Sequence, residues 1–256
     1  MKLEGNVALV TGGNQGIGRG IAITLAKEGA DVAVAARNYT KSQEVAEEIK
    51  KLGRRAIPVQ ADVTQWDQVQ AMVKRSIDEL GKIDICVNNA GAISVAPVEE
   101  LKEEDFDHVI NVNVKGVFLC CKAVIPHMKQ QGGGKIINTG SIGGKTGFPT
   151  LAHYNASKFA VHGFTNALAK ELAKDNITVN AICPGIVRTY MWDYLSDLWK
   201  QPGETVEDSW KRHLDTLIPQ GRAQTPEDMG ELVVYFATAD SVTGQAFNVD
   251  GGFMLG

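Results

Sequence analysis

The sequence predicts a single α/β domain with a doubly wound parallel sheet, and three observations support this fold class. Short apolar runs of strand type alternate with segments of helical periodicity along the 256 residues. Such alternation produces right-handed β-α-β crossovers and a parallel sheet with helices on both faces. A glycine-rich turn joins the first apolar run to the first helical segment, and no repeat or proline-rich linker interrupts the sequence. We therefore expect one domain over residues 1–256.

The first half of the chain is expected to contain four strands with helices between them. Residues 7–11 form the first apolar run, and a helix at 16–28 follows because Ile17, Ile21 and Leu25 recur on one side. The other strands expected here are 31–35, 56–60 and 83–88, and the other helices are 42–52 and the amphipathic segment 66–80.

The second half continues this pattern with one interruption. The expected elements are a helix at 106–128, a strand at 135–139, a helix at 154–173, a strand at 178–183, a helix at 226–237 with proline in its first turn, and a strand at 246–249. Residues 190–220 break the rhythm and carry Trp192, Trp199 and Trp210. We interpret this segment as an excursion over the sheet rather than as a second domain.

The composition excludes several classes of function. The net charge is −4 and the pI is near 5.8, which indicates no basic surface for nucleic acid or an anionic membrane. The first residues lack the features of a signal peptide, and no apolar run is expected to approach the length of a membrane span. The cysteines lie in apolar segments without Cys-x-x-Cys spacing, which is typical of buried thiols in a reducing compartment. We expect a cytoplasmic protein without a metal site.

The glycine-rich turn after the first strand is a candidate phosphate-binding site. Glycines let the backbone turn sharply and approach a pyrophosphate, while the N-terminus of the next helix offers unpaired N–H groups. No Gly-Lys-Ser/Thr follows, which excludes a nucleoside-triphosphate loop. The alternative is a tight turn that serves only the fold. We expect a dinucleotide to contact Gly12, Asn14, Gln15, Gly16, Ile17 and Gly18.

The end of the second strand bears on which nicotinamide dinucleotide binds. An acidic residue there would accept hydrogen bonds from the adenosine ribose of NAD, but the sequence reads Ala36, Arg37, Asn38. Arg37 can pair with the 2′-phosphate of NADP, and no carboxylate stands at Ala36 to repel it. This favours NADP(H), with NAD(H) as the alternative if Arg37 stacks on adenine or faces solvent.

Two further strand ends carry polar side chains. Asp62-Val63 follows the third strand, where the carboxylate can cap a turn and touch the adenine edge. Asn88 and Asn89 end the fourth strand and precede Ala90-Gly91. These side chains can cap loops, and the two amides can instead close hydrogen bonds across adjacent strand ends. The spacing alone does not separate these two interpretations.

A candidate chemical centre lies in the middle of the chain. Tyr154 and Lys158 are four residues apart in a helical segment and therefore share one helix face. A lysine cation near a phenol favours the phenolate, and such a tyrosine can exchange a proton with an alcohol or a ketone. Ser141 ends the fifth strand, where its hydroxyl can hold a substrate oxygen. Asn113 is a polar residue in an otherwise apolar helical stretch.

Together these features resemble the short-chain dehydrogenase/reductase family, in its branch with chains of about this length. The resemblance covers essentially the whole chain. It rests on Thr-Gly-x-x-x-Gly-x-Gly at 11–18, Asp62, Asn-Asn-Ala-Gly at 88–91, Asn113, Ser141, Tyr-x-x-x-Lys at 154–158, Pro184-Gly185 and Thr189. It implies a Rossmann-type fold and hydride transfer supplied by NAD(P)(H). The sequence departs from the usual NAD type at the end of the second strand.

The resemblance also implies a role for each matching residue. Tyr154 would be the acid/base, Lys158 would lower its pKa and hold the nicotinamide ribose, and Ser141 would polarise the substrate oxygen. Asn113 would hold a water that links Lys158 to solvent. Beyond the turn, the expected cofactor contacts are Arg37, Asn38, Asp62, Val63, Asn89, Ala90, Gly91, Tyr154, Lys158, Pro184, Gly185, Ile186, Val187 and Thr189.

The resemblance implies that residues 189–220 form a lid over the substrate. This segment is longer and more aromatic than the lid of reductases that act on acyl-carrier-protein substrates, and it resembles the lid of polyol, diol and acetoin-type dehydrogenases. Trp192 is expected to face the substrate, whereas Trp199 and Trp210 are expected to pack the lid onto the domain. The expected substrate contacts are Ser141, Gly143, Tyr154 and Trp192.

The leading hypothesis is an oxidoreductase that transfers a hydride between NAD(P)(H) and a secondary alcohol or ketone, with a polyol, sugar or vicinal diol as substrate. The alternatives are a 3-oxoacyl-thioester (acyl-carrier-protein) reductase and a non-catalytic dinucleotide-binding redox sensor. A sensor does not need Tyr154, Lys158, Ser141 and Asn113 together, which argues against it. The resemblance further implies a homotetramer, with helices 106–128 and 154–173 and the strand region 247–252 at its interfaces.

Overall fold

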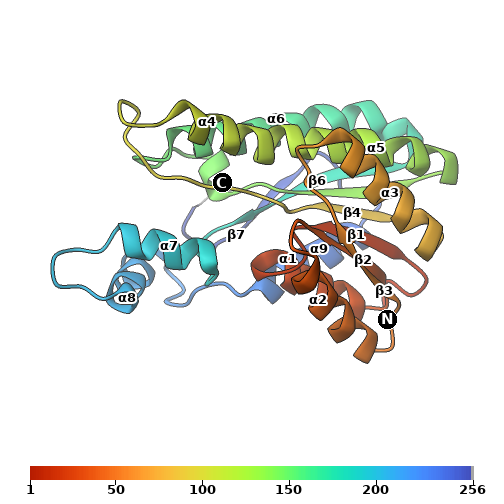
Figure 1. Cartoon of the computed structure of the whole chain (residues 1–256), viewed down its shortest axis with the longest axis horizontal. Coiled ribbons are helices and arrows are strands. Elements are labelled where there is room, and N and C mark those ends of the chain that lie inside the picture. The colour runs from red at the N-terminus through yellow and green to blue at the C-terminus, as the bar shows by residue number, and fades with distance from the viewer. Residues whose placement is uncertain (255–256) are drawn as a thin grey trace.

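A computed structural model describes residues 1–254 and shows a parallel sheet with helices on both faces (Figure 1). Its strands follow the order β3-β2-β1-β4-β5-β6-β7. Their bounds are β1 (Val7–Thr11), β2 (Asp31–Ala36), β3 (Ala56–Gln60), β4 (Ile85–Asn88), β5 (Gly134–Thr139), β6 (Ile177–Pro184) and β7 (Ala246–Val249). The order reverses between β1 and β4, which opens a crevice at the carboxyl edge of the sheet. The predicted doubly wound parallel sheet is confirmed.

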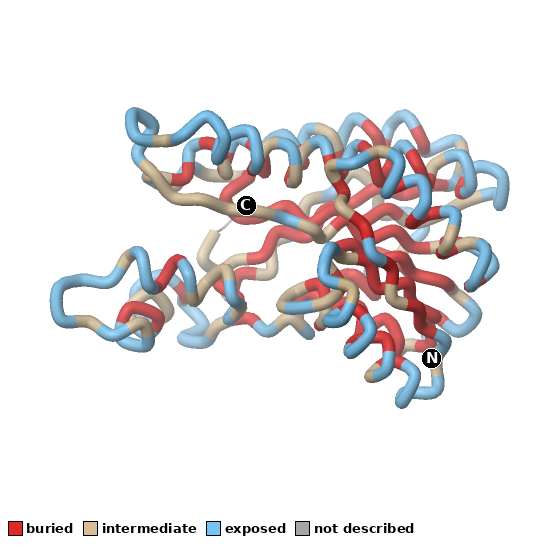
Figure 2. Tube along the Cα trace, viewed as in Figure 1, coloured by how far each residue is buried: buried red, intermediate tan, exposed pale blue. Residues whose placement is uncertain are grey.

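The helices form two layers around this sheet. One layer contains α1 (Gly16–Lys27), α2 (Tyr39–Lys51) and α9 (Pro226–Thr238), and the other contains α3 (Trp66–Leu80), α4 (Glu103–Ile110), α5 (Gly116–Gln131) and α6 (Ala152–Leu172). Neighbouring residues of β1 serve different layers, because Leu9 packs with α3 and α5 whereas Val10 packs with α1 and α9. Burial on both faces keeps the strands mostly apolar, and Figure 2 shows that the central strands are buried.

The long helix predicted at 106–128 contains a local irregularity. The helical path begins earlier, at Glu103, and a π-helical turn over Asn111–Lys115 separates α4 from α5. A π-helical turn accommodates one extra residue and is frequent at functional sites. Periodicity over the whole segment did not predict it, because the apolar residues on either side still follow a helical pattern.

The same segment corrects one expectation from the sequence. Residues Glu103–Gln131 form a continuous helical stretch of 29 residues whose most apolar window has a mean hydropathy of 1.5, which is long and apolar enough to cross a membrane. Half of that window is buried inside the protein, and helices in the core of a globular domain meet the same criterion. The expectation that no run reaches this length was therefore wrong.

The excursion after β6 forms a small helical unit beside the main body, at the left of Figure 1. It consists of α7 (Tyr190–Leu198) and α8 (Val206–Leu217). Its small core contains Trp210 and Ile218, packed with Ile186 and the partly buried Trp192. A capping box starts α8, since Thr205 accepts a hydrogen bond from the Asp208 N–H and the Asp208 carboxylate accepts one from the Thr205 N–H.

Candidate active site

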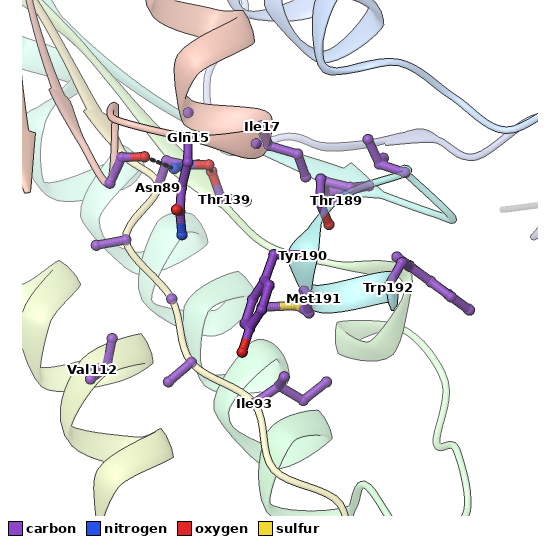
Figure 3. Close-up of a pocket in the computed structure, with 18 of the residues that line it drawn as sticks. Gln15, Ile17, Asn89, Ile93, Val112, Thr139, Thr189, Tyr190, Met191 and Trp192 are labelled. Atoms are coloured by element: carbon purple, nitrogen blue, oxygen red, sulfur yellow. Dashed lines mark hydrogen bonds between the residues drawn. The ribbon is translucent and has the colours of Figure 1, made fainter. Parts of the chain in front are cut away.

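A cavity of about 1540 Å³ lies at the carboxyl edge of the sheet, between the strand ends and α7 (Figure 3). Every residue predicted to contact the cofactor, from Gly12 to Thr189, lines this cavity. Of the predicted chemical and substrate residues, Ser141, Tyr154, Lys158 and Trp192 line it. Asn113 and Gly143 do not line it and lie buried behind its wall.

The glycine-rich turn has the geometry that a pyrophosphate requires. Gly12 and Gly16 have φ values of +63° and +52°, which favour glycine over residues with a side chain. A Cβ at Gly18 would lie 2.1 Å from the Gly12 carbonyl oxygen, so only glycine lets the helix approach the turn this closely. No side chain caps the N-terminus of α1, which leaves its first N–H groups for a ligand. These residues therefore fit a bound dinucleotide.

Basic side chains gather where β2 and β3 end. Arg37 is exposed at the cavity wall, and its carbonyl accepts a hydrogen bond from Gln60 Nε2. Asn38 caps α2 by accepting a hydrogen bond from the Lys41 N–H at 3.1 Å. The Lys41 ammonium also lines the cavity and donates to Gln15 Oε1 at 3.2 Å. Sequence reasoning missed Lys41, although its position in the first turn of α2, opposite the glycine-rich turn, could have pointed to it.

Asp62 caps the loop that follows β3. Its carboxylate accepts hydrogen bonds from the N–H and the hydroxyl of Thr64, at 2.9 and 2.8 Å. Burial alone would raise the pKa of Asp62, but these hydrogen bonds and the nearby charge of Arg37 lower the pKa overall. Asp62 is therefore an anion that both caps the turn and lines the cavity.

The two asparagines at the end of β4 close hydrogen bonds across neighbouring elements. Asn88 Nδ2 donates to Asn138 Oδ1 on β5 at 2.9 Å, and Asn138 Nδ2 donates to the Thr165 hydroxyl on α6 at 2.9 Å. Asn89 Nδ2 donates to the carbonyl oxygen of Thr11 on β1 at 3.1 Å. The geometry thus selects bridging between strand ends over simple loop capping.

Asn113 sits in the π-helical turn and anchors the chain that follows β4. Its Oδ1 accepts from the Ala92 N–H at 2.8 Å, and its Nδ2 donates to the Ala92 carbonyl and to the Ser157 hydroxyl at 3.0 and 2.9 Å. A Cβ at Gly91 would lie 3.4 Å from Asn113 Oδ1 and 4.0 Å from Lys158 Nζ. Asn113 is therefore close to Lys158, although its side chain is occupied by backbone and by Ser157.

Ser141 starts a short turn of 3₁₀-helix over Ile142–Gly144. Its Oγ accepts a hydrogen bond from the Gly143 N–H at 3.0 Å. This bond uses only a lone pair of the Ser141 oxygen, and the Ser141 side chain also hydrogen-bonds to Tyr154. Gly143 thus supports Ser141 from behind the cavity wall, and a Cβ there would lie 2.9 Å from Asn155 Oδ1.

Tyr154 lies in the first turns of α6 at the cavity wall. Burial raises the pKa of Tyr154 above its usual value near 10, and the neighbouring Ser141 hydroxyl opposes this shift only in part. The direction is opposite to the one expected from Lys158, whose Nζ lies 5.7 Å from the centre of the Tyr154 ring. Tyr154 is therefore a neutral phenol at neutral pH.

Lys158 is almost fully buried one helical turn after Tyr154. Its Nζ donates to the Thr139 carbonyl oxygen at 2.8 Å. Burial lowers the pKa of Lys158 to about 8, because the low-dielectric surroundings disfavour the cation. The ammonium is mostly charged at pH 7 and loses its charge slightly above that pH.

The aromatic residues of the lid form one cluster. The Trp192 ring makes edge contacts with Trp199, Trp210 and His213, at centroid distances of 6.0, 6.0 and 5.9 Å. Trp192 lines the cavity as predicted, but it also belongs to the lid core, and Trp199 lines the cavity as well. Sequence periodicity could not separate these roles, because the contacts join α7 to α8.

Several cavity residues near Tyr154 were not predicted. They share apolar side chains and lie in loops or at helix ends, namely Ile93, Ile142, Phe148, Leu151, Met191 and Phe253. Tyr190 and Met191 lie beside Thr189 at the entrance in Figure 3. No motif marks these residues, because loop positions without a charged or polar side chain carry little signal in a single sequence.

The comparisons with known proteins agree with this geometry. A family model described as short chain dehydrogenase matches residues 6–198. A "3-oxoacyl-[acyl-carrier-protein] reductase FabG" of Thermotoga maritima is 38% identical over 100% of both chains. An "L-2,3-butanediol dehydrogenase" of Corynebacterium glutamicum is 41% identical over 97% of this chain and 98% of the relative.

The solved structures include a levodione reductase that is 29% identical to this chain. It superimposes with a TM-score of 0.93 over 98% of both chains. The match therefore extends beyond the nucleotide-binding half to the whole sheet and the lid region. On these grounds, the chain belongs to the short-chain dehydrogenase/reductase family and is an NAD(P)-dependent oxidoreductase.

Proposed function

We propose that this protein interconverts a secondary alcohol and its ketone, with Tyr154 exchanging the proton at the substrate oxygen. The observation that carries this proposal is the position of Tyr154, Ser141 and Lys158 in the same cavity as an uncapped, glycine-lined helix N-terminus. A nicotinamide dinucleotide, when bound, supplies or accepts the hydride at the substrate carbon.

The protonation states and hydrogen bonds favour a different role for each of these side chains. The pKa of Tyr154 is raised, so at neutral pH the phenol is ready to donate a proton to a ketone oxygen. The Ser141 oxygen accepts from the Gly143 N–H, and its hydroxyl would donate to the same substrate oxygen. Lys158 would hold the nicotinamide ribose through its ammonium, and Asn113 would support the proton path from Lys158 to solvent.

We further propose that the preferred cofactor is NADP(H). Arg37 and Lys41 both line the cavity beyond the ends of β2 and β3, and no carboxylate stands at Ala36. Two cations would stabilise a 2′-phosphate, with each charge-assisted hydrogen bond worth about 1.5–3 kcal/mol. Arg37→Ala and Lys41→Ala should therefore weaken NADPH binding by about tenfold or more while leaving NADH binding nearly unchanged. Equal losses for both nucleotides would refute this assignment.

The charge of the lid bears on the choice between a free substrate and one bound to a carrier protein. Residues 189–220 contain six acidic and three basic side chains, which would repel an acidic carrier. This supports a small free substrate of the secondary-alcohol or vicinal-diol type. The 3-oxoacyl-thioester reductase remains the alternative, because the Thermotoga maritima relative carries that name.

A substrate panel with Tyr154→Phe tests the proposed function. Purified protein is assayed with NADPH and NADH against acetoin, simple ketones and acetoacetyl thioesters. Tyr154→Phe should lower kcat by about 10²–10⁴ while the Kd for NADPH stays unchanged. Tight nucleotide binding without turnover of any substrate would favour the redox sensor. Wild-type rates in Tyr154→Phe would refute the proton-transfer role.

We also propose a homotetramer in the cytoplasm. Phe106, Phe118 and Phe159 are exposed on α4, α5 and α6, and Tyr235 and Phe247 are exposed on α9 and β7. Apolar side chains on two separate faces suit the two kinds of interface in a tetramer with dihedral symmetry. The four cysteines are free and buried, which suits a reducing compartment. Light scattering that gives a monomer mass would refute the tetramer.

A further inference from the structure

The part of the cavity around Tyr154 has a wall built from hydrocarbon side chains. Ile142 directly follows Ser141, and Phe148 and Leu151 come from the loop that leads into α6. Ile93 and Met191 also line the cavity, and both are labelled in Figure 3. Apart from Ser141 and Tyr154, the uncharged hydroxyl groups near this wall belong to Thr189, Tyr190 and Tyr194 of the lid.

The charged side chains that line the cavity lie elsewhere or are already paired. Three of them lie beyond the ends of β2 and β3, where the adenosine of the dinucleotide would bind, namely Arg37, Lys41 and Asp62. Near the lid, the Arg188 guanidinium binds the carboxylates of Asp193 and Glu207 at 2.8 and 3.0 Å. It also lies 4.7 Å from the centre of the Trp210 ring.

The histidine of the lid is also engaged. His213 Nδ1 lies 2.7 Å from the Ser209 carbonyl oxygen, and its ring contacts the Trp199 ring in a tilted arrangement at a centroid distance of 5.6 Å. The Lys158 ammonium also lines the cavity, but it donates to the Thr139 carbonyl oxygen and would hold the nicotinamide ribose. Apart from Lys158, the described residues that line the substrate end include no carboxylate and no cation without a carboxylate partner.

Phe253 closes this wall from the C-terminal segment. Its ring meets the Phe148 ring edge to face at a centroid distance of 5.9 Å, and it packs against the lid core that contains Trp210. The segment is held in place by the buried Asp250, whose carboxylate accepts hydrogen bonds from the N–H groups of Gly252 and Met254 at 3.0 and 2.9 Å. Phe253 therefore links the loop before α6 to the lid.

We infer that the substrate is a neutral ketone whose carbonyl carries a ring or branched hydrocarbon group, and that Phe148 and Phe253 select it by packing on that group. This inference rests on the proposed function and narrows its substrate class by disfavouring sugars and polyols. In the reduction, the carbonyl carbon gains a hydride from the reduced nicotinamide dinucleotide and the oxygen gains the Tyr154 proton. The products are the secondary alcohol and the oxidised dinucleotide, and Tyr154 regains its proton from solvent.

The apolar wall would select a hydrocarbon group because removing polar groups from water costs free energy. A hydroxyl group that finds no partner in an apolar wall loses its hydrogen bonds to water, and an unpaired carboxylate loses far more. A hydrocarbon ring of the same shape gains by leaving water and by contact with aromatic side chains. Pockets of this composition fix orientation with a few polar groups and derive affinity from apolar contact.

Matched pairs of ketones test the substrate class. Cyclohexanone is compared with pentahydroxycyclohexanone, and ethyl acetoacetate with acetoacetate, each with saturating NADPH. We expect kcat/KM to be at least about 100-fold higher for the apolar or neutral member of each pair. Equal or higher values for the hydroxylated or anionic member would overturn the inference while leaving the proposed function intact.

Variants of Phe253 test the residue assignment. Phe253→Ala should lower kcat/KM for cyclohexanone by roughly tenfold or more through a higher KM, with the Kd for NADPH unchanged. Phe253→Leu keeps an apolar side chain and should recover most of this loss. The control Leu52→Ala removes an exposed apolar side chain far from the cavity and should change neither constant. Wild-type kcat/KM in Phe253→Ala would overturn the assignment.

A binding experiment separates failure of this inference from failure of the proposed function. If no ketone is reduced, calorimetry with the NADP⁺ complex compares cyclohexanol with inositol, which has the same ring with six hydroxyl groups. Binding of cyclohexanol alone would support the apolar site and refute only the proposed chemistry. Binding of inositol alone, or of neither alcohol, would overturn the inference.

Discussion

The buried charge of Lys158 should lower the free energy of unfolding at neutral pH. Burial lowers the pKa of Lys158 from 10.5 to about 8, so the unfolded chain binds this proton more tightly than the folded one. At pH 7 both states are mostly protonated, and the folded state carries the full penalty. At about 1.4 kcal/mol per pH unit, the shift costs about 3 kcal/mol of unfolding free energy.

The substitution Lys158→Met replaces the ammonium by an apolar side chain of similar length. It removes the penalty of about 3 kcal/mol, but it leaves the Thr139 carbonyl oxygen without the bond it receives at 2.8 Å. That loss costs about 1 kcal/mol. We therefore expect Lys158→Met to be more stable than the wild type by about 2 kcal/mol at pH 7, although the substitution abolishes the proposed chemistry.

The sign of the pH dependence distinguishes this explanation from simple repacking. Above pH 8 the folded wild type releases the Lys158 proton while the unfolded chain still holds it, so the wild type gains stability as the pH rises. The advantage of the variant should fall from about 2 to about 1 kcal/mol between pH 7 and pH 9. Urea unfolding at fixed protein concentration measures both values. A less stable variant, or an advantage that does not change with pH, would refute this reasoning.

Three further predictions concern the proton chemistry, the glycine-rich turn and the lid. The kcat/KM for ketone reduction should fall as the pH rises through about 8, because Lys158 then loses its charge; a profile that stays flat to pH 10 would contradict this role. Gly18→Ala should cost more than about 2 kcal/mol of unfolding free energy and weaken dinucleotide binding, because its Cβ would lie 2.1 Å from the Gly12 carbonyl oxygen; calorimetry that shows an unchanged Tm would exclude this clash. Thr205→Ala removes half of a capping box and should lower the free energy of local opening of α8 by about 1 kcal/mol, which is measured as faster hydrogen exchange. Exchange equal to the wild type would show that the cap is dispensable.

The sequence was most informative where one local requirement determines the residue. The turn at Gly12–Gly18 needs glycine for its backbone angles and close contacts, so both its position and its structure could be predicted. The spacing of Tyr154 and Lys158 by four residues is enough to predict that they share one helix face. The strands were equally clear, because burial on both faces demands apolar residues throughout.

The sequence was least informative where several segments meet. Lys41 reaches Gln15 across 26 positions, and Phe253 meets Phe148 only because the C-terminal segment folds back over the cavity. The pKa of Tyr154 depends on burial by the whole cavity wall, which spacing to one lysine does not describe. Such properties belong to the tertiary structure, and no local pattern reports them.

The hydrogen-bonded amides of Asn88 and Asn138 also bear on how the chain reaches its fold. These residues are register partners on β4 and β5, and both are fully enclosed. A slip of one residue in either direction would separate the two amides and place one of them opposite an aliphatic residue, Ile137 or Val87. The stranded group would cost about 1–3 kcal/mol, and every side chain of the strand would turn to the other face. An apolar pair would tolerate such an error more easily. The two amides therefore favour the correct register of β4 and β5 over a shifted one during folding.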